Sequence, residues 1–168
     1  VPEDKKQKLI DAEKEYNRLA AEKAKEKIDA IGTVTPENAE EKKQAIEDAR
    51  DVYDSLTDSQ KELITEEEKK KLTDAEKTYD ETKGNQDKEA ADKVKDKIDA
   101  ILVPVQDNEE TKQKIEDAFD AYENLTGTQK DMVSGEDKKK LEDAKDVYDN
   151  LQADKVKDKI DAIGEVTP

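Results

Sequence analysis

Short sequence patterns recur along this chain of 168 residues, and this repetition limits the folds that it can adopt. Pattern A, AKEKIDAI at Ala24–Ile31, returns as VKDKIDAI at Val94–Ile101 and again, identical to that second copy, at Val156–Ile163. Pattern B spans Ala45–Ile64 and returns at Lys114–Val133. Self-similarity of this kind indicates a fold assembled from repeated supersecondary units.

A third pattern, C, begins at Lys70 (KKLTDAEKTYD) and Lys139 (KKLEDAKDVYD), with an earlier copy, KLIDAEKEY, at Lys8. In chain order the patterns read C, A, B, C, A, B, C, A. Patterns B and C recur after 69 residues, as Tyr53 and Tyr122 show (122 − 53 = 69). One period is therefore about as long as one three-helix bundle, and the chain looks cut from a longer array.

The apolar residues are few, but they follow the period of an α-helix. Only 32% of the residues are hydrophobic and 46% are charged, where typical proteins have roughly 45–50% and about 25%. Such a composition also fits disorder. However, Ile46, Ala49, Tyr53 and Leu56 step by 3, 4 and 3, and the copies keep this register. All four prolines and all glycines except Gly84 lie between the periodic segments, so we expect folded helices.

The residues between patterns A and B predict a helix end followed by a helix start. Gly32 suits a left-handed position that closes the first helix. Thr35 suits the N-cap of the next helix, with Pro36 in its first turn. The same arrangement is expected at 164–168.

The segments after pattern B predict a short lid helix bounded by two capping boxes. The motifs are Thr57-x-x-Gln60 and Thr65-x-x-Glu68 in the first copy, and Thr126-x-x-Gln129 and Ser134-x-x-Asp137 in the second. The lids are expected to carry Leu63 and Ile64, and Met132 and Val133.

Pattern C runs into the following pattern A with no such stop. Asp4–Ile31 and Glu136–Ile163 contain neither Pro nor Gly, which predicts helices of about 28 residues, or about 42 Å. The middle junction is seven residues longer, and one heptad keeps the apolar stripe on nearly the same face to within ~20°. This favours a continuous helix there; Gly84-Asn85 favours a stop.

We therefore expect an all-α fold of tandem three-helix bundles, joined by shared long helices into an elongated rod. Residues 1–17 would be the C-type helix of a preceding repeat, 18–83 the first bundle, 84–151 the second bundle, and 152–168 the first helix of a following repeat. The expected core of the first bundle is Ala24, Ile28, Ile31, Ile46, Ala49, Tyr53, Leu56, Leu63, Ile64, Leu72, Ala75 and Tyr79. The expected core of the second is Val94, Ile98, Ile101, Ile115, Ala118, Tyr122, Leu125, Met132, Val133, Leu141, Ala144 and Tyr148.

The composition argues against several classes of function. The chain has no His and no Cys, so a Ser–His or Cys–His nucleophile pair and the usual zinc ligands are absent. A net charge of −16 opposes binding to nucleic acid. No hydrophobic run approaches the ~20 residues that cross a bilayer. We predict no enzymatic activity, no cofactor, no dedicated metal site and no membrane insertion, in a monomeric part of a longer multidomain chain.

Three features of the sequence are candidates for binding sites. Gln106–Glu110 is acidic but lacks the spacing of a calcium loop. The lysine clusters 69–71 and 138–140 follow acidic residues, which favours a mixed solvated face over a glycan site. Phe119, Val147 and Val52 are the candidates for an apolar binding patch, and each could instead widen the core.

The strings IDAIGEVTP, AIEDARDVYDSLTDSQKELI and KLTDAEKTYD resemble the helical repeat modules of large secreted and wall-attached proteins of Gram-positive bacteria. The likeness to FIVAR modules is distant, since their aromatic-Thr-x-x-Ser-Trp element has no counterpart, and the topology is similar to that of spectrin. The resemblance implies an extracellular location, secreted or attached to the cell wall, and a structural spacer or stalk that projects other domains. The alternative function is an adhesin-type module that docks a host protein or glycan on a helix face.

Overall fold

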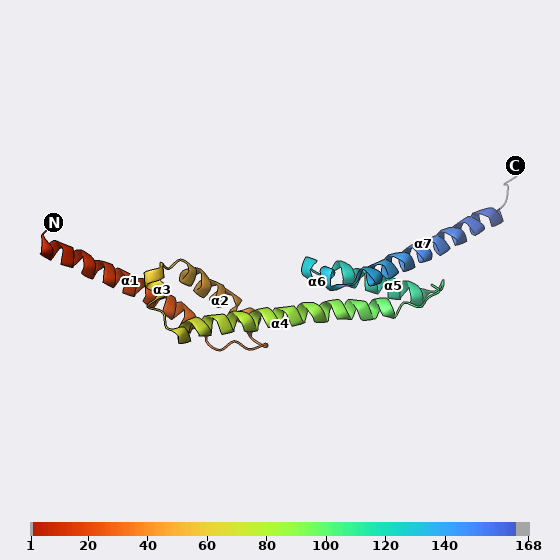
Figure 1. Cartoon of the computed structure of the whole chain (residues 1–168). Coiled ribbons are helices and arrows are strands. Elements are labelled where there is room, and N and C mark those ends of the chain that lie inside the picture. Colours follow the sequence, from red (N-terminus) through yellow and green to blue (C-terminus); the bar gives the residue numbers. More distant parts are fainter. Residues whose placement is uncertain (1, 164–168) are drawn as a thin grey trace. The chain divides into compact units, whose positions relative to one another are not determined.

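The computed structural model describes residues 2–163, and within them the chain forms seven helices and no strand (Figure 1). The helices are α1 (Glu3–Ile31), α2 (Ala39–Asp54), α3 (Asp58–Lys61), α4 (Glu66–Asp99), α5 (Glu109–Glu123), α6 (Gly127–Met132) and α7 (Gly135–Ile163). The predicted all-α class is confirmed. The chain divides into two compact units, one up to Gly84 and one from Asn85 on.

The first unit has a core to which three long helices contribute. In Figure 1, α2 and α3 lie beside the second half of α1 and the first half of α4. The spacing of 3 and 4 residues places the apolar side chains of each helix on one face, and that face is buried. The core residues are Ala21, Ala24, Ile28, Ile31, Ile46, Ala49, Leu56, Ile64, Leu72 and Ala75.

The second unit has a core of the same kind. The second half of α4, α5 and the first half of α7 contribute to it, together with residues that follow α4 and α6. Its buried members are Ala91, Val94, Ile98, Ile101, Ile115, Ala118, Val133, Leu141 and Ala144.

The helices that span patterns C and A are long. The expected unbroken helices to Ile31 and Ile163 are confirmed as α1 and α7. The helix α4 includes Gly84 and Asn85 without interruption. A Cβ placed on Gly84 would meet no atom within 4 Å, so no close packing requires a glycine there. A glycine inside a helix lowers its stability by about 1 kcal/mol relative to alanine, and the helical turns on both sides of Gly84 outweigh this loss.

Local capping motifs form where the sequence predicts them. The backbone N–H of Thr57 donates to Gln60 Oε1 (3.0 Å), and that of Thr65 donates to Glu68 Oε2 (2.7 Å). In the second unit, the N–H of Thr126 donates to Gln129 Oε1 (2.9 Å). Ser134 Oγ accepts from the N–H of Asp137 (3.0 Å). Each bond satisfies a backbone group at a helix start.

The start of the second helix differs from the prediction. Thr35 does not cap it, and α2 begins at Ala39. Instead, the Asn38 side chain accepts from the N–H of Thr35 (2.8 Å) and donates to the carbonyl of Thr33 (3.1 Å). These bonds close a turn over 35–38, which delays the helix. Gly32 has the expected positive φ (67°), but its ψ of −153° is extended and not left-handed helical. The arrangement expected at 164–168 lies outside the described residues.

Two of the predicted lid residues do not enter the cores. Ile64 and Val133 are buried, whereas Leu63 and Met132 are exposed. α3 ends at Lys61, before both first-lid residues, and α6 ends at Met132. Consecutive side chains at the end of a short helix point in different directions. Only one residue of each pair therefore reaches the core.

Candidate functional site

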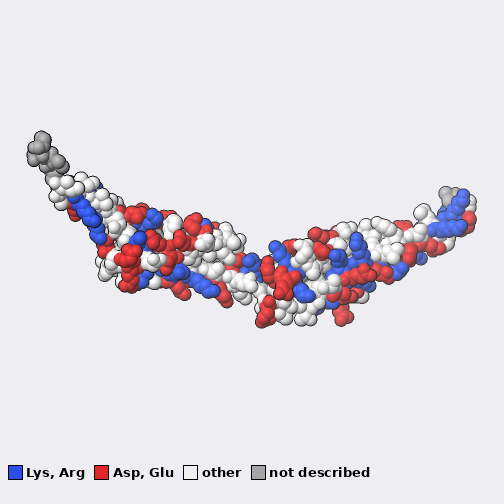
Figure 2. All heavy atoms as spheres, turned by 180° about the vertical axis from the view of Figure 1, so that it is seen from behind, with Lys and Arg blue, Asp and Glu red and all other residues white. Residues whose placement is uncertain are grey.

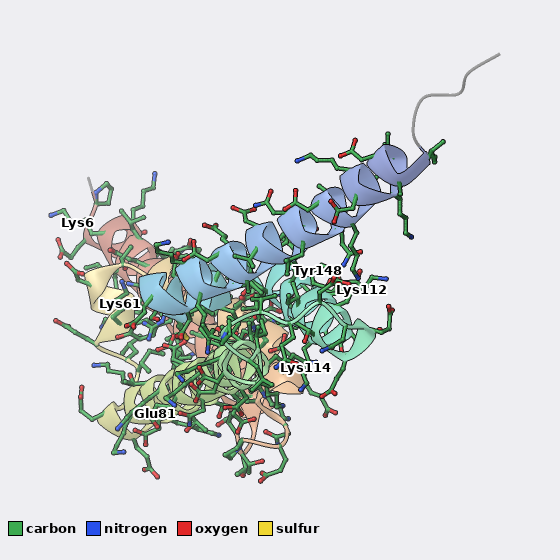
Figure 3. The ribbon with its side chains drawn as sticks, turned by 90° about the vertical axis from the view of Figure 1, so that its right-hand side faces the viewer. Lys6, Lys61, Glu81, Lys112, Lys114 and Tyr148 are labelled. Carbon is green, nitrogen blue, oxygen red and sulfur yellow. The ribbon has the colours of Figure 1, made fainter. Side chains whose placement is uncertain are left out.

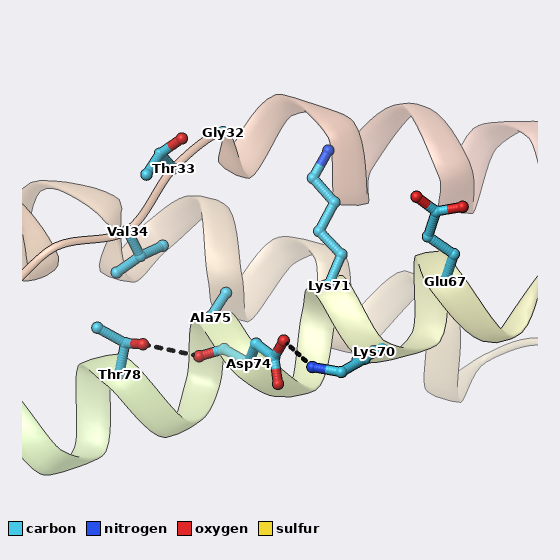
Figure 4. Close-up of a pocket in the computed structure, with 9 residues that line it drawn as sticks. All are labelled: Gly32, Thr33, Val34, Glu67, Lys70, Lys71, Asp74, Ala75 and Thr78. Atoms are coloured by element: carbon cyan, nitrogen blue, oxygen red, sulfur yellow. Dashed lines mark hydrogen bonds and ion pairs between the residues drawn. The ribbon is translucent and has the colours of Figure 1, made fainter.

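A surface groove in the first unit lies between the loop after α1 and the first half of α4 (Figure 4). We call it groove 1; it is lined by Gly32, Thr33, Val34, Glu67, Lys70, Lys71, Asp74, Ala75 and Thr78. Thr78 donates its hydroxyl to the carbonyl of Asp74 (2.9 Å), and Lys70 pairs with the Asp74 carboxylate. The lining is therefore mostly polar and already internally bonded.

The second unit has a groove at the equivalent place. We call it groove 2; it is lined by Val103, Pro104, Val105, Glu136, Lys139, Lys140, Asp143, Ala144 and Val147. Six of its residues belong to α7, and each lies 69 positions after a residue of groove 1. Five of these six are the same amino acid as in groove 1, and the sixth is Val147 in place of Thr78. Val103 is 75% exposed and Val147 is 44% exposed. Groove 2 therefore offers an apolar floor and a charged rim, as small binding sites often do.

An ion pair that recurs in both units lies at the edge of each groove. Lys71 Nζ lies 2.7 Å from Asp29 Oδ1 in the first unit, and Lys140 Nζ lies 3.2 Å from Asp99 Oδ1 in the second. Hydrogen bonds from Lys95 and then Lys140 hold the pKa of Asp99 below its usual range. These pairs join the end of pattern A to the start of pattern C, so they position the groove walls.

A third hollow lies between α5 and α7 in the second unit. Phe119, Ile115 and Tyr148 line it, with Lys112 and Lys145 at its rim. Figure 3 shows Lys112 beside Tyr148. The Lys145 ammonium lies 6.0 Å from the centroid of the Phe119 ring, within the range of a cation–π contact.

The tyrosines predicted at the core edge are partly buried. Four tyrosines and Leu125 pack against the cores from the rim: Tyr53 and Tyr79 in the first unit, and Tyr122, Leu125 and Tyr148 in the second. Arg50 and Lys61 lie 5.4 Å and 5.5 Å from the Tyr53 ring centroid. The aromatic rings thus contact basic side chains of their own unit.

The other predicted core residues are buried, apart from Leu63 and Met132. They are Ala24, Ile28, Ile31, Ile46, Ala49, Leu56, Ile64, Leu72, Ala75, Val94, Ile98, Ile101, Ile115, Ala118, Val133, Leu141 and Ala144. Of the patch candidates, Val52 and Phe119 pack against the cores, and Val147 lines groove 2. Val52 belongs to the first unit, and Phe119 and Val147 belong to the second.

Lysines and carboxylates are interspersed on the visible surface of each unit (Figure 2). Lys69 pairs with Glu66 (2.7 Å), and Lys139 pairs with Asp143 (2.6 Å). In the acidic stretch 106–110, Asp107 accepts from Lys155 (2.5 Å) and Gln152 (2.7 Å), and the Lys155 bond is the main cause of its lowered pKa. These clusters are therefore mixed ion-pair surfaces.

An ion pair with two hydrogen bonds joins α2 and α4 in the first unit. Arg50 of α2 donates Nε and Nη2 to the two carboxylate oxygens of Glu76 in α4, at 2.6 Å and 2.5 Å. This two-point bond raises the pKa of Arg50 above its usual range. Arg50 also donates Nη1 to Asp54 of α2 (3.4 Å), so the pair links α2 to α4 through one guanidinium group.

The described residues, 2–163, hold neither a cluster of metal ligands nor a membrane-spanning helix. No three His, Cys, Asp or Glu side chains there come close enough together to hold a metal ion. No helix in that range is both sufficiently long and sufficiently apolar to span a bilayer.

The sequence analysis missed a set of exposed apolar residues near the two ends of the described range. They lie in α1 between Leu9 and Leu19 and in the second half of α7, and are Leu9, Ile10, Tyr16, Leu19, Val156, Ile160 and Ile163. The signal was present in the repeat, since most of them occupy positions whose copies are buried elsewhere.

Comparisons with protein-family models, with curated proteins and with solved structures find no match to this chain.

Proposed function

We propose that the chain is a structural spacer of a bacterial extracellular surface protein, secreted or attached to the cell wall, that projects other domains. In this proposal each unit is a three-helix bundle, and shared helices join the bundles into a rod. The expected division into 1–17, 18–83, 84–151 and 152–168 belongs to this proposal. The location comes from the resemblance to repeat modules of Gram-positive surface proteins.

One observation carries the proposal: a single helix supplies both cores. Leu72 and Ala75 of α4 lie in the first core, and Val94 and Ile98 of the same helix lie in the second. Bending such a helix sharply at Gly84 would break several consecutive backbone hydrogen bonds. A shared helix is therefore a device for transmitting stiffness from unit to unit.

The charge of the chain suits this role. Its net charge of −16 keeps neighbouring copies apart and soluble, and adds mutual repulsion along an array. The ion pairs within each helix, such as Lys88–Asp92 (2.6 Å), join residues four positions apart and add a small preference for helix over coil.

A distance measurement between spin labels tests the spacer. The chain has no cysteine, so Lys70→Cys and Lys139→Cys introduce the only two labelling sites. Both side chains are largely exposed. We expect a narrow distribution of distances, and a broad one after two glycines are inserted beside Gly84. A broad distribution in the chain without the insertion would contradict the spacer.

Groove 2 favours a second candidate function, an adhesin-type module that docks a host protein or glycan. Its exposed residues Val103 and Val147 distinguish it from groove 1, where Thr33 and Thr78 stand at the corresponding places. Val147→Thr copies the groove 1 residue Thr78 and is the matched control variant. Saturable binding of a host protein or glycan at micromolar concentration would support this function over a pure spacer if the binding is lost in the Val147→Thr variant.

A further inference from the structure

The second half of α7 presents an exposed apolar stripe. Its members are Ala153, Val156, Ile160 and Ile163, spaced by 3, 4 and 3 residues. Val156 is 56% exposed, Ile160 61% and Ile163 72%. A stripe with this spacing is the face that a helix normally buries against a partner. We call it the α7 stripe.

The same residues are buried elsewhere in the chain. Val94 and Ile98 of α4, and Ile101 just after its end, are 3%, 0% and 2% exposed, and Val94–Ile101 has the same sequence as 156–163. These three residues join one core with residues of α5 and α7. Because the two segments have identical side chains, their own sequence does not explain the difference in burial, whereas the helices that pack against 94–101 do.

The stripe in α1 provides a second example. Ala21, Ala24, Ile28 and Ile31 keep the spacing of the α7 stripe and lie in the first core. They are covered by α2 and the first half of α4, which carry patterns B and C. Both buried copies of pattern A are thus covered by a B helix and the C helix that follows it.

Polar contacts that accompany the buried stripes have equivalents beside the α7 stripe. Asn17 and Asp87 each lie four residues before the first alanine of a buried stripe, Ala21 or Ala91. Asn17 accepts a hydrogen bond from Gln60 (3.0 Å), and Asp87 accepts one from Gln129 (2.8 Å). The equivalent residue in α7 is Asp149. Asp29 and Asp99, which pair with lysines of pattern C, have their equivalent in Asp161. The α7 stripe therefore has the acceptors that a B–C segment would engage.

We propose that the α7 stripe binds a helical segment of the repeat's own B–C type. Such a segment brings an Ile/Ala/Tyr helix, a capped lid turn with a glutamine, and a Leu/Ala/Tyr helix preceded by a lysine. The inference deepens the proposed spacer function, because it names the partner that would continue an array from α7.

A second copy of this chain fits the stripe less well. Both B helices of the chain, α2 and α5, are already packed in its own cores. The first half of α1 has an unpartnered C-type face, with Leu9 70% exposed, but it brings no B helix. Two copies meeting end to end would thus leave one of the three helix positions empty.

An extended chain tests the proposal. Residues 164–168 repeat Gly32–Pro36 with one difference, Glu165 for Thr33, so a copy of residues 37–83 is appended after Pro168. Hydrogen exchange of the amides at 156–163 is then compared with the chain of 168 residues. We expect exchange to slow by about tenfold or more in the extended chain, because docking ties these amides to a cooperative unit.

Two control variants identify the contact. Ile160→Ser should abolish the added protection, while Asp158→Ser, on the opposite side of the helix, should leave it unchanged. An appended segment with its copies of Ile46 and Leu72 changed to serine should give no protection. Unchanged exchange in the extended chain, or equal protection from the serine-substituted segment, would overturn the proposal.

Self-association provides a further outcome. If the chain without an extension forms dimers in sedimentation and these protect 156–163, then a second copy covers the stripe and the proposal is wrong. The spin-label test uses neither the stripe nor the extension. A failure of docking and a failure of the spacer are therefore distinguishable.

Discussion

Leu72 and Leu9 occupy the same position of pattern C, yet Leu72 is 1% exposed and Leu9 is 70% exposed. The sequence around the two leucines is similar, so intrinsic helix propensity does not separate them. The free energy that each contributes depends on how much apolar surface leaves water. These two residues therefore allow burial to be tested at constant sequence position.

We expect Leu72→Ala to lower the free energy of unfolding by about 2–5 kcal/mol, because it removes buried methyl groups and leaves a cavity. Chemical denaturation followed by circular dichroism measures this loss. The matched variant Leu9→Ala should change the same quantity by no more than about 0.5 kcal/mol. Equal losses for the two variants would show that the core is placed wrongly.

Lys140 and Asp99 provide a prediction on pH dependence. The lowered pKa of Asp99 means that folding stabilises the ionised carboxylate relative to the protonated carboxyl group. The resulting stability is complete above the ordinary pKa of 3.8 and is lost as the pH falls through the lower, folded pKa. Lys140→Met should raise the pKa of Asp99 only in part, because the hydrogen bond from Lys95 remains.

NMR titration of the Asp99 carboxyl carbon measures this shift. Lys139→Met is the control, since Lys139 pairs with Asp143 and not with Asp99. A pKa of Asp99 that stays the same in Lys140→Met would show that the two groups do not pair in solution.

Gly32, which follows the end of α1, and Gly84, inside α4, predict substitutions of opposite sign. Gly32 has a φ of 67°, which an L-residue with a Cβ rarely adopts. Gly32→Ala should therefore destabilise the first unit by about 1–2 kcal/mol. Thermal unfolding measures the change, and an unchanged midpoint would contradict the strained geometry at this turn.

At the scale of elements, the helix α4 explains why Gly84 is tolerated. An alanine Cβ at this position would meet open space, and the backbone is helical. Gly84→Ala should raise the free energy of unfolding by about 0.4–1 kcal/mol, because it removes conformational freedom from the unfolded chain. A loss of stability in denaturation experiments would indicate that the helix breaks at Gly84.

The lid elements show that capping geometry is local while burial is not. Thr57 and Gln60 bond across three residues, so their interaction is predictable from spacing alone. Which of Leu63 and Ile64 is buried depends on where α3 ends and which helices lie beneath it. The same reasoning applies to Met132 and Val133.

At the scale of the whole molecule, the shared helix predicts that the two units unfold as coupled elements. Gly84→Pro removes an intrahelical hydrogen bond and clashes with the preceding turn, at a cost of about 3 kcal/mol or more. In the unchanged chain we expect Leu72→Ala to increase hydrogen exchange at Val94–Ile98 as well as in the first unit. With Gly84→Pro, that effect should stay within the first unit.

Lys83→Pro places a second proline in α4 and repeats the test. Lys5→Pro is the control, since position 5 lies at the exposed start of α1. Proline in α4 should uncouple the units, whereas proline in the first turn of α1 should not. Exchange at Val94–Ile98 that is insensitive to Leu72→Ala even in the unchanged chain would contradict coupling through α4.

The sequence by itself determined the helices and most of their ends. The spacing of Ile46, Ala49, Tyr53 and Leu56, and the capping pairs such as Thr126 and Gln129, involve residues at most four positions apart. Contacts over such short separations form within the helix or turn itself, so the local pattern predicts them. The start of α2 escaped prediction because the Asn38 side chain competes for the turn at Thr35.

Only the tertiary structure decided which apolar residues are covered. Ile98 and Ile160 stand in identical stretches of sequence, and one is fully buried while the other is 61% exposed. The two grooves also differ through a loop and a helix that meet only in the fold. Burial is a property of the neighbours that the folded chain brings to a residue, and those neighbours lie far along the sequence.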